Sequence, residues 1–185
     1  MKTLSFSDSA KQVLIEMSGV LEKVNEQEVE RFVARISRAK KIVILGAGRM
    51  GIVSKSFAMR LKHFGLNAYC YGDSNVPNIG KGDLLIVCSG SGETRTILKL
   101  CEVAKEHNCP IFLISTKTSS SMAKLASDIV VIPAPSKTDD NFSIQPMTSL
   151  NEQSLWIFFD TIVLLLMKAL KKTEKDLWKA HSILE

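Results

Sequence analysis

The chain has 185 residues, of which 45% are hydrophobic and 23% are charged, and its formal net charge is +5. This length supports one domain with a sizeable core but not two ordinary domains, and the composition excludes a disordered chain. Because the basic residues are dispersed and aromatic residues make up only 6%, we expect no nucleic-acid partner, whereas the positive charge suits small phosphorylated molecules.

The first part of the chain carries two helical patterns. Apolar residues recur at helical spacing from Val13 to Val24, and Asn25 with Glu28 forms the capping pair of a second helix. We therefore expect N-terminal helices over residues 8–38.

Short apolar runs then alternate with helical patterns as far as residue 135. The predicted strands cover residues 41–45, 67–72, 82–90, 110–116 and 128–134, and the predicted helices between them cover 52–64, 94–108 and 120–126. Such alternation is typical of right-handed βαβ units. It predicts an α/β fold over residues 40–135, with about five parallel strands flanked by helices in a flavodoxin-like three-layer sandwich.

A polar loop and an apolar helix complete the chain. Residues 133–147 contain three prolines and few apolar side chains, and long loops of this kind are often functional. The stretch 149–170 is apolar on nearly every side, so it belongs in the core or in a subunit interface. With a short last helix in the tail, we expect C-terminal helices over residues 149–183.

The cysteines and the apolar segments indicate the compartment. The four cysteines form no CxxC pair and no Cys/His cluster, which predicts buried free thiols, a reducing environment and no metal site. The N-terminus lacks the apolar segment of a signal peptide. The most apolar stretch, LWIFFDTIVLLLM, is interrupted by polar residues and is too short to cross a bilayer. We expect a cytoplasmic protein with no membrane partner.

Glycine-rich turns follow two of the predicted strands. The first, GAGRMG (46–51), has the spacing of a dinucleotide-binding loop, and Asp73 lies where a ribose-binding acid is expected. Against NAD or FAD, two helices precede this turn, the sheet is small, and no second domain provides a substrate site. The second turn, SGSGET (89–94), also has no place in the dinucleotide fingerprint.

The second turn is suited to a phosphate group. Ser89, Ser91 and Thr94 offer hydroxyls, and Gly90 and Gly92 allow close approach of backbone N–H groups. A phosphate monoester at a helix N-terminus needs several such donors. The alternative is an ordinary Ser/Gly turn in which Thr94 caps the next helix.

A phosphorylated small molecule shared between the two turns accounts for more residues than NAD does. From the first turn, Gly48 and Arg49 would join such a site, Arg49 by pairing with the phosphate or with sugar hydroxyls. The alternative for Arg49 is an ordinary surface arginine.

Several segments together resemble a known family. GAGRMG, SGSGET and STKTSSSMAKLAS resemble the SIS (sugar isomerase) domain, an α/β fold that binds phosphosugars. From about Val29 to Glu185, the segments GAGRMGIVSKSFAMRLKHFG, GKGDLLIVCSGSGET, SIQPMTSLNEQS and HSILE are similar, in that order, to the 6-phospho-3-hexuloisomerase family.

This resemblance implies a reaction and an assembly. The family converts D-arabino-3-hexulose 6-phosphate to fructose 6-phosphate, in formaldehyde assimilation through the ribulose monophosphate pathway. The resemblance also implies a homotetramer with active sites near subunit interfaces, and no metal or organic cofactor. The chain departs from the family at Met50, where Ser is usual. Methionine donates no hydrogen bond, so binding weaker by roughly 0.5–1.5 kcal/mol is expected.

The chemistry requires a base that moves a proton between neighbouring carbons. Transfer of a carbonyl from C3 to C2 removes the C2 proton, forms an enediol and returns a proton to C3, and one base can serve both steps. The family motif places its catalytic glutamate at Glu152, for which an ordinary acid in the first helical turn is the alternative.

Histidines and an amide complete the candidate site. His63, where the family commonly has histidine, and His181, in the terminal HSILE, are candidates for shuttling protons between the sugar oxygens. A structural role at a helix end is the alternative for both. Gln145 is a weaker candidate for contacting a sugar hydroxyl. Two other functions stay open: an SIS isomerase acting on another sugar, such as arabinose 5-phosphate, and a non-catalytic phosphosugar-binding protein.

Overall fold

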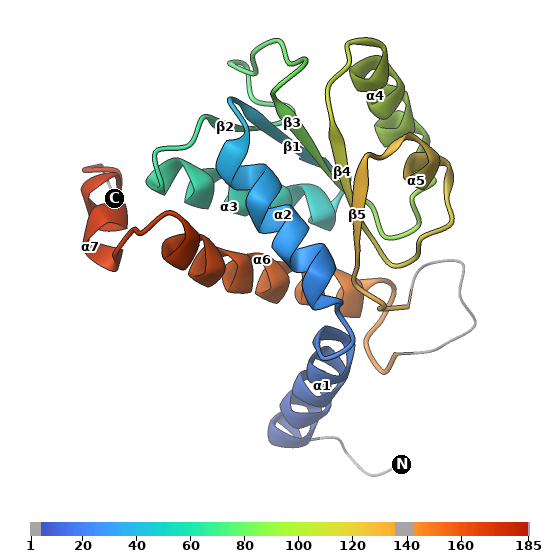
Figure 1. Cartoon of the computed structure of the whole chain (residues 1–185). Coiled ribbons are helices and arrows are strands. Elements are labelled where there is room, and N and C mark those ends of the chain that lie inside the picture. Colours follow the sequence, from blue (N-terminus) through green and yellow to red (C-terminus); the bar gives the residue numbers. More distant parts are fainter. Residues whose placement is uncertain (1–4, 136–142, 185) are drawn as a thin grey trace.

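Five parallel strands form the centre of the protein, which is described from a computed structural model over residues 5–135 and 143–184. The strands are β1 (Ile42–Gly46), β2 (Ala68–Cys70), β3 (Leu84–Cys88), β4 (Ile111–Ser115) and β5 (Asp128–Val131). Their order in the sheet is β2-β1-β3-β4-β5 (Figure 1). In register, Ile42 of β1 lies opposite Ala68 on one side and Leu84 on the other. The predicted parallel sheet is confirmed; β1 is shifted by one residue from its predicted run, and the other four strands are shorter than theirs.

Helices cover both faces of this sheet, which confirms the three-layer sandwich. One face carries α2 (Glu26–Arg38), α3 (Arg49–His63) and α6 (Ser149–Ala169), and the other carries α4 (Arg95–Glu106) and α5 (Ser121–Leu125) (Figure 1). Both faces of the central strands are apolar because both are buried, as is typical of parallel sheets.

Aromatic rings fill the core on the α2/α3/α6 face. The ring of Phe32 lies 4.7 Å from that of Phe112, and the rings of Phe57 and Phe159 stack at 3.9 Å between centroids. Each fully buried side chain of this kind contributes about 1.5–3 kcal/mol. These contacts fix α3 and α6, whose N-terminal ends build the site described below.

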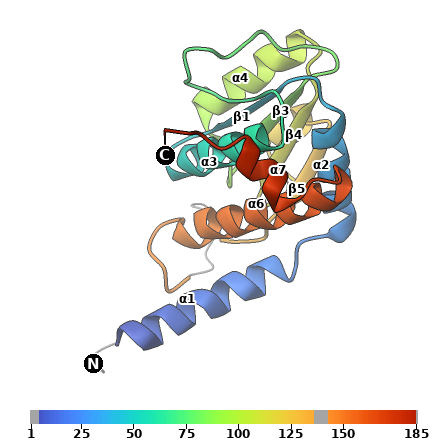
Figure 2. The ribbon, with the colours of Figure 1, turned by 90° about the vertical axis from the view of Figure 1, so that its left-hand side faces the viewer.

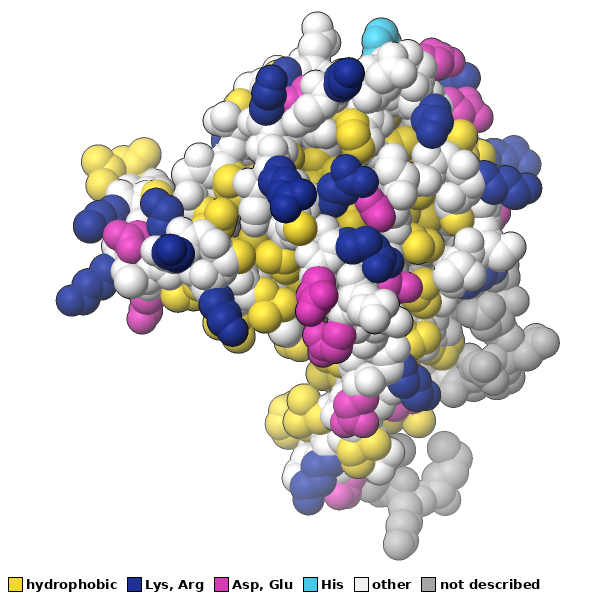
Figure 3. Space-filling view, in the orientation of Figure 1, with side chains coloured by type: hydrophobic (Ala, Val, Ile, Leu, Met, Phe, Trp, Pro, Cys, Tyr) yellow, Lys and Arg dark blue, Asp and Glu magenta, His cyan; other side chains and the backbone are white. Residues whose placement is uncertain are grey.

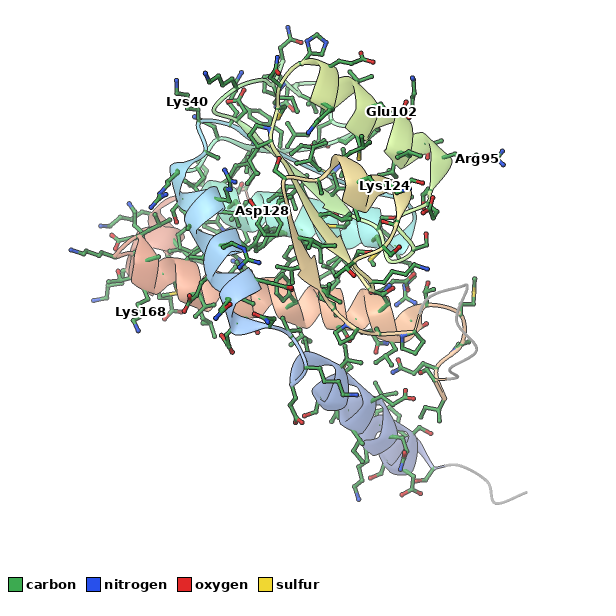
Figure 4. The ribbon with its side chains drawn as sticks, turned by 45° about the vertical axis from the view of Figure 1, so that its right-hand side comes forward. Lys40, Arg95, Glu102, Lys124, Asp128 and Lys168 are labelled. Atoms are coloured by element: carbon green, nitrogen blue, oxygen red, sulfur yellow. The ribbon has the colours of Figure 1, made fainter. Side chains whose placement is uncertain are left out.

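An ion pair ties α2 to the edge of the sheet. Asp128 lies at the start of β5 (Figure 4). Its carboxylate accepts from Arg35 Nη2 at 2.7 Å, and Arg31 Nε lies 3.6 Å away. In the same contact region, Glu28 accepts a hydrogen bond from the backbone N–H of Val131. These links hold α2 across the sheet next to its last strand.

Two helices lie outside the sandwich. Helix α1 (Phe6–Leu21) lies beside α6, farther from the sheet, and extends past the body of the protein (Figures 1 and 2). Of its side chains only that of Val20 is buried. Helix α7 (Glu174–Lys179) contacts α3 near the C-terminus.

The apolar composition of α6 has a packing explanation. Contrary to the expectation from its most apolar stretch, the whole helix is long and apolar enough to cross a membrane, because it extends beyond that stretch at both ends; half of its apolar window is, however, buried inside the protein. Leu155, Phe158 and Ile162 face the core, whereas Trp156 and Leu164 are 41% and 65% exposed. The helix therefore belongs to the core and also presents apolar side chains to the outside.

The four cysteines are buried free thiols, as predicted. Burial raises the pKa of the Cys88 thiol to about 12. Of the long polar loop expected at 133–147, residues 136–142 lie outside the described part of the chain, as does the terminal Glu185.

Candidate functional site

A cavity of about 220 Å³ opens at the carboxyl ends of β1 and β3. These neighbouring strands flank the point where the strand order reverses, which is where open α/β sheets bind ligands. The cavity is lined by both glycine-rich turns and by the start of α6, through Ala47, Gly48, Arg49, Met50, Cys88, Ser89, Gly90, Ser91, Thr94, Thr148, Asn151 and Glu152. Seven of the predicted site residues therefore meet in one place.

The three helices that begin at this cavity have no side-chain caps. Helices α3, α4 and α6 start after Gly48, Thr94 and Thr148, and none of these residues makes a capping hydrogen bond from its side chain. The other described helices, α1, α2, α5 and α7, are capped by Ser5, Asn25, Ser120 and Thr173. Uncapped ends leave N–H groups and the positive ends of the helix dipoles available to an anion.

Ser89 presents a hydroxyl that lacks a partner. The residue is 4% exposed, and its Oγ makes no hydrogen bond with any described residue. A buried polar group left unsatisfied costs about 1–3 kcal/mol. Since Ser89 lines the cavity, a ligand there would supply the missing partner.

The shape of the second turn depends on its two glycines. The carbonyl of Gly90 accepts hydrogen bonds from the hydroxyls of Ser115 and Thr116 at 2.9 and 2.8 Å. Gly92 has φ = +65°, and a Cβ at this position would lie 2.1 Å from the Oγ of Ser120. Gly92 does not line the cavity, so its contribution is to the path of the backbone.

Glu152 lies at the edge of the cavity in an ion pair with Arg49. Arg49 Nη1 is 2.8 Å from Glu152 Oε2 and donates to Ser149 Oγ at 3.0 Å. The other carboxylate oxygen accepts from Thr148 Oγ1 at 2.9 Å. The side chain of Glu152 is 13% exposed, and that of Arg49 is 55% exposed. A carboxylate is thus held beside a set of anion donors, an arrangement suited to proton transfer on a bound anion.

An apolar groove adjoins the same pair of charged residues. It has a volume of about 340 Å³, lies between α1, α3 and α6, and includes Val13, Ile52 and Trp156 in its walls together with Arg49 and Glu152. The ion pair therefore separates a polar cavity from an apolar groove that is open to the outside.

The structure places His63 and His181 away from this cavity within one chain. His63 ends α3, whose first residue is Arg49, so the two ends of the helix are about 21 Å apart at 1.5 Å per residue. The ring of His63 lies 5.4 Å from that of His181, which in turn lies 4.9 Å from that of Trp178. The two histidines come together, as a pair, at the opposite end of α3 from Glu152.

Gln145 also has a different role from the expected one. It does not line the cavity, and its Nε2 donates to Glu16 of α1 at 3.1 Å. The carboxylate of Glu16 accepts further hydrogen bonds from Ser143 Oγ and from the backbone N–H of Ile144. Burial raises the pKa of Glu16, but these hydrogen bonds outweigh the burial and lower it below its usual value. Gln145 thus attaches the segment that leads into α6 to the N-terminal helix.

Sequence reasoning missed Thr148, Ser149 and Asn151. All three precede Glu152 on the first turn of α6, a position that could have drawn attention to them. Nothing in the periodicity of the segment shows which of these polar side chains turns toward the cavity. Within residues 5–135 and 143–184, no group of three or more His, Cys, Asp or Glu side chains could hold a metal ion.

Comparison with known proteins connects this geometry to a family. The sequence pattern of the SIS domain matches residues 35–159. The chain is 34% identical to the 3-hexulose-6-phosphate isomerase of Bacillus subtilis (strain 168), with 94% of this chain and 96% of that protein covered. It is 37% identical to the Mycobacterium gastri protein of the same name, with 92% and 86% covered.

A solved structure agrees with these sequence matches. It is that of a hypothetical protein of Methanococcus jannaschii, for which a molecular function of 3-hexulose-6-phosphate isomerase was inferred. The TM-score is 0.84 at 30% identity, with 96% of this chain and 99% of the other covered.

Proposed function

The chain belongs to the SIS domain family, and on that premise we propose that it is an isomerase that converts D-arabino-3-hexulose 6-phosphate to fructose 6-phosphate. The observation that carries the proposal is the single cavity in which the uncapped ends of α3, α4 and α6 meet the carboxylate of Glu152. Relatives named for this reaction share at least a third of their residues with the chain over most of its length.

The phosphate group binds between the two glycine-rich turns. Its donors are the hydroxyls of Ser89, Ser91 and Thr94, together with N–H groups at the starts of α3 and α4. The hydroxyl of Ser89 has no other partner among the described residues, so phosphate binding satisfies it. Met50, which also lines the cavity, contributes van der Waals contact but no hydrogen bond.

Glu152 acts as the base. Its carboxylate removes the proton from C2 of the 3-ketose, the electrons of that C–H bond form the C2–C3 double bond, and the C3 oxygen takes a proton from a general acid, the role that we assign to His63 or His181 of a neighbouring copy. The resulting enediol returns the proton of its C2 hydroxyl to that group as the carbonyl forms at C2, and C3 takes back the proton held by Glu152. Arg49, paired with Glu152 at 2.8 Å, is placed to stabilise negative charge on the enediol oxygens. The 3-ketose 6-phosphate cannot close a five- or six-membered ring, so it binds in the open-chain form.

The active form is a homotetramer in which apolar faces of α1, α3 and α6 are covered by other copies. Leu14, Ile52 and Leu164 are each more than 60% exposed, and Figure 3 shows hydrophobic side chains between the charged ones along the projecting α1. Apolar surface of this kind, concentrated on neighbouring helices, is typical of subunit interfaces.

His63 and His181 act on the site of a neighbouring copy. The length of α3, about 21 Å, separates the two histidines from Glu152 of their own chain. In an assembly that is formed through α3 and α6, a second chain would lie close to the groove beside Glu152. Mixing Glu152→Gln subunits with His181→Ala subunits tests this. We expect each variant alone to be inactive and the mixture to regain part of the activity, because some sites then receive both intact residues. If the mixture stays inactive, the histidines do not act across subunits.

The reaction is tested by supplying the substrate directly. The 3-hexulose 6-phosphate is generated in situ, and fructose 6-phosphate formation is followed with a coupled enzyme. Product formation that depends on this protein supports the proposal. Without product, turnover of arabinose 5-phosphate would indicate another SIS isomerase, and binding without any turnover would indicate a phosphosugar-binding protein. Both alternatives rest on Met50, which stands where the family usually has a serine.

A further inference from the structure

Asn151 is a second buried polar residue in the wall of the cavity. The residue is 3% exposed and lines the cavity. An asparagine side chain has two donor hydrogens and one acceptor oxygen. In the cavity wall these groups are available to a ligand.

The amide of Asn151 packs against Gly90, where the absence of a side chain leaves room for it. A Cβ on Gly90 would lie 2.2 Å from Asn151 Nδ2, so the amide occupies the space that any other residue at position 90 would fill. Gly90 stands between Ser89 and Ser91 in the hydroxyl-rich turn. The Nδ2 atom of Asn151 therefore lies against the middle of the turn that we assign to the phosphate, one residue before the base.

A role in holding α6 together does not account for this side chain. Asn151 lies in the first turn of α6, where a polar side chain commonly bonds to the backbone, but here it lines the cavity. Ser154, about one turn later, provides a comparison, because it is a buried polar residue of the same helix that does not line the cavity.

We propose that Asn151 binds the phosphate group of the sugar phosphate, with its Nδ2 donating to a phosphate oxygen. The proposal rests on the function proposed above. Met50, at the start of α3, lines the same cavity but has no hydrogen-bond donor. Asn151, at the start of α6, supplies a donor in its place. The positive ends of three helix dipoles at the cavity strengthen this contact, since they attract the same anionic group.

The test compares Asn151→Leu with the wild-type protein. Leucine has the same branching and the same number of side-chain heavy atoms as asparagine, and it cannot donate a hydrogen bond. We expect the affinities for fructose 6-phosphate and for inorganic phosphate both to fall about 10- to 100-fold, the range for a hydrogen bond to a charged group. We expect the melting temperature without ligand to change little, because the side chain is assigned to the ligand and not to the packing of α6. Ser154→Ala is the matched control and should leave both affinities unchanged.

Several results would overturn the proposal. Unchanged phosphate affinity in Asn151→Leu would mean that the amide does not contact the phosphate group. A lower melting temperature without ligand would indicate a structural role. If Asn151→Leu does not fold, Met50→Ser is used alone: it should raise the affinity for both ligands, and unchanged affinity would contradict a missing donor at the phosphate. Wild-type protein that binds neither ligand would instead refute the proposed function itself.

Discussion

Replacement of Glu152 by glutamine is the most direct test of the proposed base. Glutamine keeps the length and shape of the side chain, and its Oε1 can still accept the hydrogen bond that Thr148 donates at 2.9 Å. Glutamine cannot take up a proton. Its Nε2, a hydrogen-bond donor, would face Arg49 Nη1 at the position where a carboxylate oxygen now lies 2.8 Å from that atom. The substitution therefore removes the proton transfer and the ion pair but leaves the phosphate donors in place.

The two losses differ in size. Loss of a general base lowers the rate roughly 10²- to 10⁴-fold, which is about 2.7–5.4 kcal/mol of activation free energy. Loss of the ion pair costs at most about 1 kcal/mol of folding stability, because Arg49 is more than half exposed to solvent. We therefore expect kcat to fall at least 100-fold, while the affinity for fructose 6-phosphate and the melting temperature change little.

The assay measures kcat and KM with 3-hexulose 6-phosphate, and fructose 6-phosphate affinity by calorimetry. Arg49→Gln is measured beside it, because it removes the same ion pair but keeps the carboxylate. Since Arg49 is also assigned to the enediol oxygens, we expect it to lose some kcat, but less than Glu152→Gln does. Turnover within a few fold of wild type in Glu152→Gln would refute the assignment of the base, and so would a larger loss of kcat in Arg49→Gln than in Glu152→Gln.

Three further predictions concern the second turn, the attachment of α1 and the thiols. Gly92→Ala should lower the free energy of unfolding by about 1–3 kcal/mol in urea titrations, since φ = +65° is strained for alanine and its Cβ would meet Ser120; an unchanged midpoint would show that the turn relaxes. Because hydrogen bonds lower the pKa of Glu16, its stabilising contribution is present above the unfolded value of about 4.5 and is lost as pH falls below it. Glu16→Gln should therefore flatten the acid limb of a stability–pH curve, and an unaltered limb would contradict this. With the pKa of Cys88 raised to about 12 by burial, the native protein should resist alkylation of this thiol at pH 7, and rapid modification detected by mass spectrometry would show that its burial is transient.

The fold could be predicted from the sequence because its signals are local. Apolar runs such as KIVIL and LLIVC mark strands that are buried on both faces, and each is followed by a glycine-rich turn and an amphipathic helix. Parallel strands in a βαβ arrangement bring their carboxyl ends to one edge of the sheet. That rule is sufficient to place Gly48 and Ser89 at one cavity.

The rest of the site depends on contacts between distant segments, which local patterns do not show. Gln145 bonds to Glu16, 129 positions away, so its role is set by where α1 packs on α6. His63 was expected near the base because of its motif, but the length of α3 places it at the far end of the helix. Asn151 gave no signal because a polar residue in a first helical turn is ordinary until its burial is known.

The departures from ordinary helix and core chemistry are concentrated around one cavity. The four described helices that begin elsewhere are capped in the usual way, whereas the three that begin at the cavity are not. Two buried polar residues, Ser89 and Asn151, line the same space, and the Oγ of Ser89 has no hydrogen-bond partner among the described residues. Each of these features weakens the empty protein, and one anionic ligand would satisfy all of them together. When several local rules are broken at a single place and followed elsewhere, a binding site is the simplest physical explanation.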